Sequence, residues 1–252
     1  MATNSDALLA APGIRQAAVR SLEHRFFKAV AMLFPLLTFA GFARSYYLKF
    51  LSDAPPLPGG TAVHIHGLVM SAWVVLFSVQ AYLGATKRIK LHIALGMIGI
   101  GLAAAVLVTG TITSLSAVKR GGTFPGFTPN EFLMIPTFDL VMFAAAFIAA
   151  IIWRRRPADH KRMMLMTMLC FLPPSLARLP LEVVMQLGPI FFLGVPILIG
   201  AAAFAVDSYR RGRVNRAFAV ALGLFTVISP IRLVLAKTET WNDIAEALVR
   251  IY

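Results

Sequence analysis

Long apolar stretches follow one another along almost the whole chain, separated only by short polar loops. An α-helix needs about 20 consecutive, mostly apolar residues to cross a bilayer. Of the 252 residues, 58% are hydrophobic and 14% are charged, whereas an average soluble domain is about half apolar and one quarter charged. The chain is therefore predicted to be an integral membrane protein, and its loops leave no room for a separate soluble domain.

The apolar stretches are predicted to be helices. Lipid offers no partner to unpaired backbone groups, so only helices and closed barrels span membranes, and the stretches lack the alternating pattern of barrel strands. We therefore predict an all-α integral membrane protein, a bundle of about seven transmembrane helices. The predicted spans are residues 26–43, 62–85, 91–115, 131–153, 161–184, 189–206 and 217–237.

These spans divide the chain into three parts: an N-terminal segment of residues 1–25, a seven-helix domain of residues 26–237, and a tail of residues 238–252. In the tail, apolar residues recur at helical spacing among polar ones. This pattern predicts an amphipathic helix on the outer face of the membrane. A helix that packs on a partner subunit explains it nearly as well. The recurring apolar residues are Trp241, Ile244, Leu248 and Ile251.

The basic residues predict the orientation, because cytoplasmic loops of membrane proteins are enriched in Lys and Arg. Two thirds of the 24 Lys and Arg residues fall in the N-terminal segment, in the three loops that share its side, or in the ends of the spans that adjoin them. We therefore expect a cytoplasmic N-terminus and a multi-pass protein of the bacterial inner membrane. The formal net charge of +13 is explained by these insertion signals, and no aromatic-basic motif points to nucleic acid.

Ionisable residues inside a bilayer are costly and are functional candidates by default. In the predicted topology they gather in the outer half of the bundle, as do most prolines of the spans. Pro173 and Pro174 remove two backbone donors and must distort the fifth helix, and broken helices beside charges often build ligand sites. We therefore expect an outward-facing ligand cavity. Its predicted residues are Asp139, Arg178, Glu182, Arg232 and Trp73.

A second interpretation is that these charges only neutralise one another. Asp139 would pair with Arg178 or Arg232, and Arg178 would pair with Glu182, four residues further along a helix. The arginines would also extend toward the membrane surface.

The first histidine pair, His64 and His66, opens the second span. The rings of two residues that are two positions apart point to the same side on an extended segment and to different sides on a helix. A metal site at His64, His66 and Asp139 therefore requires that the helix begin after His66. Histidines of the core or the membrane interface are the commoner explanation of such a pair.

The second pair, His92 and His160, lies at the cytoplasmic ends of the third and fifth spans, so the two residues share a depth. Histidines on facing helices at one level can be axial ligands of a haem iron. Arg44, Arg178 and Arg232 would then neutralise an anionic group such as a propionate. The alternative is that both histidines are ordinary residues of the loop edges, where exposed histidines are common.

Several motifs carry a resemblance: His64-Ile-His-Gly67, Leu91-His92 with Leu95-Gly96, and His160-Lys-Arg-Met163. From residue 63 onward the chain resembles a family of uncharacterised bacterial polytopic membrane proteins, which implies the fold but no activity. It is more loosely similar to the transmembrane di-haem cytochromes b. That similarity implies haem ligands among His66, His92 and His160, but the fourth span has Asp139 where a histidine would be needed, so at most one haem, on His92 and His160, is implied.

Three functions follow as hypotheses. The first is a haem- or metal-binding membrane protein with a redox role, a possible membrane oxidoreductase that carries haem b or a transition metal. The second is a binder or transporter of a small anionic or amphipathic ligand. The third is a structural subunit of a larger membrane complex, as a homo-oligomer or with a partner membrane subunit. The single cysteine, Cys170, excludes intramolecular disulfides and metal motifs built on cysteine pairs.

Overall fold

The computed structural model describes residues 29, 31–51 and 59–252, and the regular structure of these residues is entirely helical. The predicted N-terminal segment and the start of the first predicted span lie outside the described residues. Five helices are long and apolar enough to cross a membrane, as expected of a multi-pass membrane protein. They are α3 (Gly60–Ala85), α4 (Ile89–Lys119), α5 (Pro129–Ile152), α9 (Pro189–Arg211) and α10 (Arg216–Leu235).

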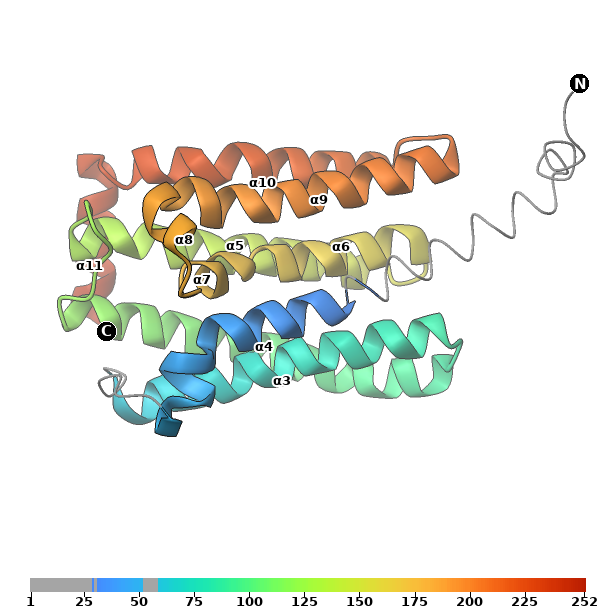
Figure 1. Ribbon diagram of the computed structural model, residues 1–252, viewed down its shortest axis with the longest axis horizontal. Helices are drawn as coiled ribbons and strands as arrows, with labels where there is room; N and C mark the ends of the chain where they lie inside the picture. The colour runs from blue at the N-terminus through green and yellow to red at the C-terminus, as the bar shows by residue number, and fades with distance from the viewer. Residues whose placement is uncertain (1–28, 30, 52–58) are drawn as a thin grey trace, which may run out of the picture.

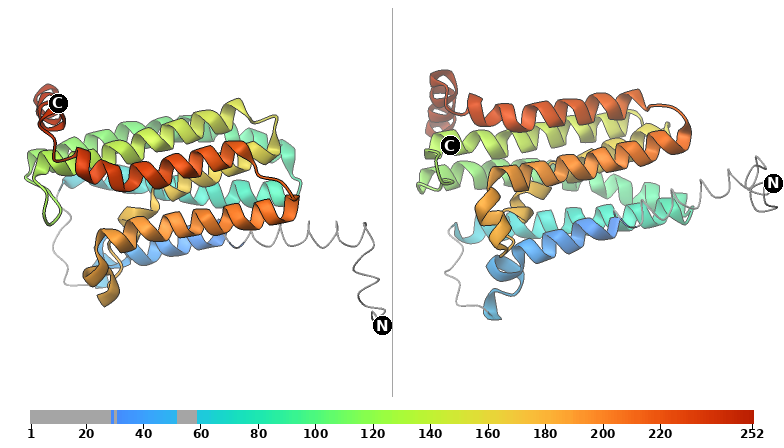
Figure 2. Two further views of the ribbon diagram at one scale, coloured as in Figure 1. Left: turned by 90° about the horizontal axis from the view of Figure 1, so that it is seen from above. Right: turned by 45° about the horizontal axis from the view of Figure 1, so that its top comes forward.

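The long helices lie side by side along the longest axis of the molecule (Figures 1 and 2). α3 packs on α4 and α4 on α5, while α10 packs on α5 and α9. Three tight turns, at residues 86–88, 153–156 and 212–215, lie at one end of the bundle. We call it the basic end, because these turns contain Lys87, Arg88, Arg213 and the run of three arginines at 154–156.

Three helices, α5, α10 and α11, begin where the sequence supplies a side-chain cap for their first backbone N–H groups. Thr128 and Glu131 form a capping box at the start of α5, with Pro129 in the first turn. The side chain of Asn215 accepts a hydrogen bond from the backbone N–H of Phe218 at 2.8 Å and so begins α10. These caps give the first backbone N–H groups of the helices an acceptor and so set where each helix begins.

The first predicted span is described only in part. Residues 31–42 are helical and continue into the π-helical turn η1 (Ala43–Tyr47) and the short 3₁₀ helix η2 (Lys49–Leu51). This helix packs on α3, where Ser78 Oγ donates to the carbonyl of Ala31 at 2.8 Å. It also lies directly against the segment that follows α6, because a Cβ on Gly41 would be 2.1 Å from the carbonyl oxygen of Ser175.

The fifth predicted span is not one helix but three: α6 (Pro157–Leu169), α7 (Leu172–Leu176) and α8 (Glu182–Leu187). The predicted distortion at Pro173 and Pro174 is confirmed. α6 ends four residues before Pro173, and both prolines lie in the first turn of α7, where a missing N–H costs no hydrogen bond.

The tail forms the helix α11 (Glu239–Ile251), which lies across the end of the bundle opposite the basic end (Figures 1 and 2). Trp241 and Ala245 are buried against α4 and α5, and Trp241 Nε1 donates to the carbonyl of Asn130 at 2.9 Å. Ile244, Leu248 and Ile251 are exposed. The predicted amphipathic helix is therefore present, with one apolar face on the bundle and a second apolar stripe facing outward.

Candidate functional site

The structure brings His92 and His160 together at the basic end. Each is the fourth residue of its helix, His92 in α4 and His160 in α6, and α5 packs against both helices. Their ring centroids are 6.1 Å apart, with an angle of 83° between the ring planes. Both residues are half-buried. Residues 68 positions apart in sequence thus form one side-chain pair, at the same end of the bundle as their shared predicted depth requires.

Each ring of this pair is held by a backbone carbonyl. His92 Nδ1 lies 3.3 Å from the carbonyl oxygen of Gln80, and His160 Nδ1 lies 2.8 Å from that of Ala150. A carbonyl can only accept, so Nδ1 carries the proton of each neutral ring and Nε2 keeps its lone pair. A carbonyl on one ring nitrogen is the usual way that proteins orient a histidine whose other nitrogen binds a metal.

A second bond ties Gln80 to the same histidine. The side-chain Nε2 of Gln80 donates to the backbone carbonyl of His92 at 3.0 Å. Gln80 on α3 therefore contacts both the ring and the backbone of His92 on α4, which fixes the position of this ring.

The predicted metal site at His64, His66 and Asp139 is corrected. α3 begins at Gly60, so both histidines are helical, and residues two apart on a helix point to different sides. His64 lies beside the ring of Tyr46, whereas His66 Nδ1 contacts Thr109 Oγ1 at 3.2 Å. In the described part of the chain, no three His, Cys, Asp or Glu residues are grouped so that they could hold a metal ion.

The predicted partnership of the histidine pair with Arg44, Arg178 and Arg232 is also corrected. Arg44 lies in η1, Arg178 follows α7, and Arg232 is in the last turn of α10. All three segments lie toward the end of the bundle opposite the basic end (Figure 1). The sequence predicts an outer position for all three arginines. That position separates them from His92 and His160, which lie at the basic end.

Asp139 and Arg232 form an ion pair inside the bundle, as the second interpretation of the charges predicted. Asp139 is 5% exposed and Arg232 is 2% exposed. Arg232 Nη1 pairs with Asp139 Oδ1 and also donates to the carbonyl of Ile135 at 3.1 Å. The pair joins α10 to α5 and neutralises both charges in the apolar interior.

The other residues predicted for the ligand cavity lie elsewhere. Arg178 is exposed; its Nη1 donates to the carbonyl of Pro174 at 2.8 Å and its guanidinium lies over the ring of Phe42. Glu182 is exposed and accepts a hydrogen bond from Gln186 at 3.1 Å. The predicted helical pairing of Arg178 with Glu182 is wrong, because α7 ends before Arg178 and α8 begins at Glu182.

Trp73, the fifth residue predicted for the cavity, belongs to the core. It is 2% exposed, and its ring lies 5.0 Å from that of Phe143 and 5.6 Å from that of Phe147, both on α5. Of the five predicted cavity residues, the described contacts therefore join only Asp139 and Arg232.

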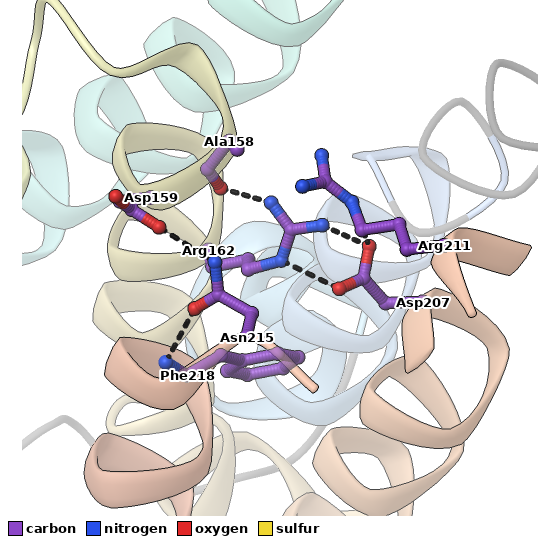
Figure 3. A network of polar contacts seen from close by, with 7 residues as sticks. All are labelled: Ala158, Asp159, Arg162, Asp207, Arg211, Asn215 and Phe218. Atoms are coloured by element: carbon purple, nitrogen blue, oxygen red, sulfur yellow. Dashed lines mark hydrogen bonds and ion pairs between the residues drawn. The ribbon is translucent and has the colours of Figure 1, made fainter. Parts of the chain in front are cut away.

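A second buried ion pair was not predicted from the sequence. Arg162 on α6 is 0% exposed and forms two parallel bonds to Asp207 on α9, through Nε at 2.8 Å and through Nη2 (Figure 3). Its Nη1 donates to the carbonyl of Ala158, and Arg211 Nε lies 3.3 Å from the same Asp207 carboxylate. The pair locks α6 to α9 close to the basic end.

A neighbouring bond extends this network to α10. The side chain of Asn215, which caps α10, donates to Asp159 Oδ1 on α6 at 2.6 Å (Figure 3). These bonds fix α6 to both α9 and α10, and the first turn of α6 contains His160. The sequence signal for this network was Asp207, an acid directly after an apolar stretch and four residues before Arg211.

Comparisons with profiles of known protein families, with curated proteins and with solved structures find no match to this chain.

Proposed function

We propose that this protein is a membrane haem protein with a redox role, in which His92 and His160 would hold one haem b through its iron. The observation that carries the proposal is the 6.1 Å separation of the two ring centroids. Two imidazoles that bind one metal from opposite sides at about 2 Å have centroids roughly 6 Å apart. The hydrogen bonds of both Nδ1 atoms leave Nε2 as the ligand atom of each ring.

The number of protein ligands favours haem over a bare ion. A structural zinc site needs four protein ligands and a catalytic one needs three, whereas the protein supplies only the axial ligands of a haem iron. The described residues supply two histidines and no group of three or more potential ligands. Lys90, two residues before His92, and Arg156, four residues before His160, are exposed cations of the basic end that would neutralise a haem propionate.

The metal content of the detergent-purified protein tests this proposal. We expect wild-type protein to bind iron as haem, and His92→Ala and His160→Ala to lose it. His64→Ala is the matched control, because His64 is an exposed histidine of the same bundle and should leave the iron content unchanged. If all three variants keep the same iron content as wild type, the histidine pair is not the site.

Replacing Gln80 by leucine is expected to weaken haem binding by up to about 10-fold, the lower end of the usual effect of losing a group that orients a metal ligand, because the ring of His92 keeps its own carbonyl acceptor. The change removes the bond from Gln80 Nε2 to the His92 carbonyl and leaves the backbone carbonyl of residue 80 in place. Haem titration of the apoprotein measures the effect, with the neighbouring, exposed Val79→Ala as the control. Equal affinities of both variants would show that Gln80 has no positioning role.

We also propose that the chain crosses the bacterial inner membrane seven times, with its N-terminus in the cytoplasm. The helix of residues 31–42 and the α6–α8 segment would supply the two crossings beyond the five long helices. The support is that the three arginine- and lysine-rich turns lie at one end of the bundle, and such residues mark the cytoplasmic side.

Cysteine labelling tests this orientation, since the one native cysteine, Cys170, is fully buried. In spheroplasts, a membrane-impermeant maleimide should label Glu246→Cys on α11 without lysis. It should label Arg155→Cys at the basic end only after lysis. Both positions are exposed, so the opposite pattern would place the basic end outside.

A further inference from the structure

Two buried arginines of this protein make different use of the same donor groups. On Arg162, the edge formed by Nε and Nη2 is filled by the two carboxylate oxygens of Asp207, and Nη1 donates to a backbone carbonyl (Figure 3). Arg162 is 0% exposed, so its charge is compensated within the protein. This arrangement is the two-bond pairing that a guanidinium and a carboxylate prefer.

Arg232 is also deeply buried, but it forms its ion pair through Nη1 and not through the edge formed by Nε and Nη2. Its Nη1 binds both Asp139 Oδ1 and the carbonyl of Ile135. Its Nε and Nη2 are buried, and no atom of the described residues accepts a hydrogen bond from either. The edge that holds a carboxylate on Arg162 therefore has no acceptor on Arg232 among the residues that the structure describes.

Such an edge is costly if it stays without an acceptor. A buried donor that lacks a partner costs about 1–3 kcal/mol, and more if it belongs to a charged group. Lipid around the bundle supplies no water to compensate. Nε and Nη2 also form the fork whose spacing matches the two oxygens of one carboxylate.

We propose that the Nε–Nη2 edge of Arg232 is a binding site for the carboxylate group of an acid, either a small soluble acid or a lipid-borne one. The same edge of Arg162 already holds a carboxylate in this protein. Because Asp139 shares the single charge of Arg232, the site suits a monoanion better than a phosphate, whose higher charge costs more to bury. The site is independent of the proposed haem ligands and lies toward the other end of the bundle.

Asp139 competes with this ligand for the charge of Arg232. Asp139→Asn removes the competing charge and keeps the size of the side chain, so it should tighten carboxylate binding. If the Asp139–Arg232 pair were only structural, the same change would destabilise the protein and no added anion would restore it.

The test measures the melting temperature of the full-length protein in detergent as sodium acetate or sodium dodecanoate is added, with sodium chloride as the ionic-strength control. We expect a saturable rise in wild type, a rise at lower concentrations in Asp139→Asn, and no rise in Arg232→Gln. Arg178→Gln is the matched control, since Arg178 is exposed, and it should respond like wild type.

A response to acetate identifies the ligand as a small soluble acid, whereas a response to dodecanoate alone identifies a lipid-borne acid. If Arg232→Gln does not fold, the comparison of wild type with Asp139→Asn remains decisive. No response of either protein beyond that to chloride would overturn the proposal. So would an equal response of Arg232→Gln and wild type.

Discussion

Asp207→Ala is expected to destabilise the folded protein by about 3–5 kcal/mol, because it leaves the buried charge of Arg162 without its partner. Arg162 is 0% exposed, and Asp207 accepts hydrogen bonds from both its Nε and its Nη2. The carbonyl of Ala158 and the partial charge of the backbone cannot replace a carboxylate. The free energy of unfolding in mixed detergent micelles measures the loss.

The surface pair of Glu246 and Arg250 on α11 provides the control. Its 2.8 Å contact resembles that of the buried pair, but its side chains are 63% and 77% exposed. Glu246→Ala should therefore change stability by less than about 1 kcal/mol. The double change Arg162→Leu with Asp207→Leu should recover most of the loss, since an apolar pair can replace a buried ion pair. Equal effects of Asp207→Ala and Glu246→Ala would contradict this account of α6 and α9.

Gly41→Ala is expected to destabilise the protein by about 1–3 kcal/mol or more, the range for overpacked cores. The new Cβ would lie 2.1 Å from the carbonyl oxygen of Ser175 and 2.7 Å from its carbonyl carbon. These are backbone atoms of α7, so the clash can be relieved only by moving the helix of residues 31–42 away from α7. The melting temperature in detergent and the yield of folded protein both report the effect.

Gly84→Ala is the matched control for this prediction. Gly84 is also helical, near the end of α3, and a Cβ there would meet nothing within 4 Å. Both changes raise helix propensity, by up to about 1 kcal/mol, so their difference isolates the steric clash. If Gly41→Ala is as stable as Gly84→Ala, the described approach of the first helix to α7 is wrong.

The long helices could be predicted from the sequence because the bilayer sets their length and lipid excludes other backbone structures. The predicted span 62–85 became α3 (Gly60–Ala85), and the predicted span 131–153 became α5 (Pro129–Ile152). At α5 the small difference at the N-terminus arises from local capping by the Thr128–Glu131 box. Helix ends depend on such side-chain bonds, which a hydropathy pattern does not contain.

The course of residues 157–187 could be predicted only in part. A proline pair predicts a break in a helix, because it removes two backbone hydrogen-bond donors. It does not say where the helix stops or how the chain continues, since both depend on tertiary contacts. The close approach of Gly41 to Ser175 is one such contact, and nothing near either residue in sequence predicts it.

The depth of His92 and His160 in the membrane could be predicted from the sequence. The rotation of their helices about the helix axes could not. The loop charges placed His92 and His160 at one level, and their 6.1 Å separation further requires that α4 and α6 turn these faces toward each other. Rotation about a helix axis is set by packing against several neighbours. Arg162 was missed because an arginine near a basic loop is explained by topology alone, and only its buried contact with Asp207 distinguishes it.

The visible absorption spectrum of the detergent-purified protein, oxidised and then reduced with dithionite, tests most directly whether His92 and His160 hold a haem. We expect a haem b spectrum with the sharp reduced band of a bis-histidine iron, and we expect this band to be lost in both His92→Ala and His160→Ala. A protein that stays colourless after expression with sufficient haem, or a haem band that survives both substitutions, would contradict the assignment of His92 and His160 as haem ligands.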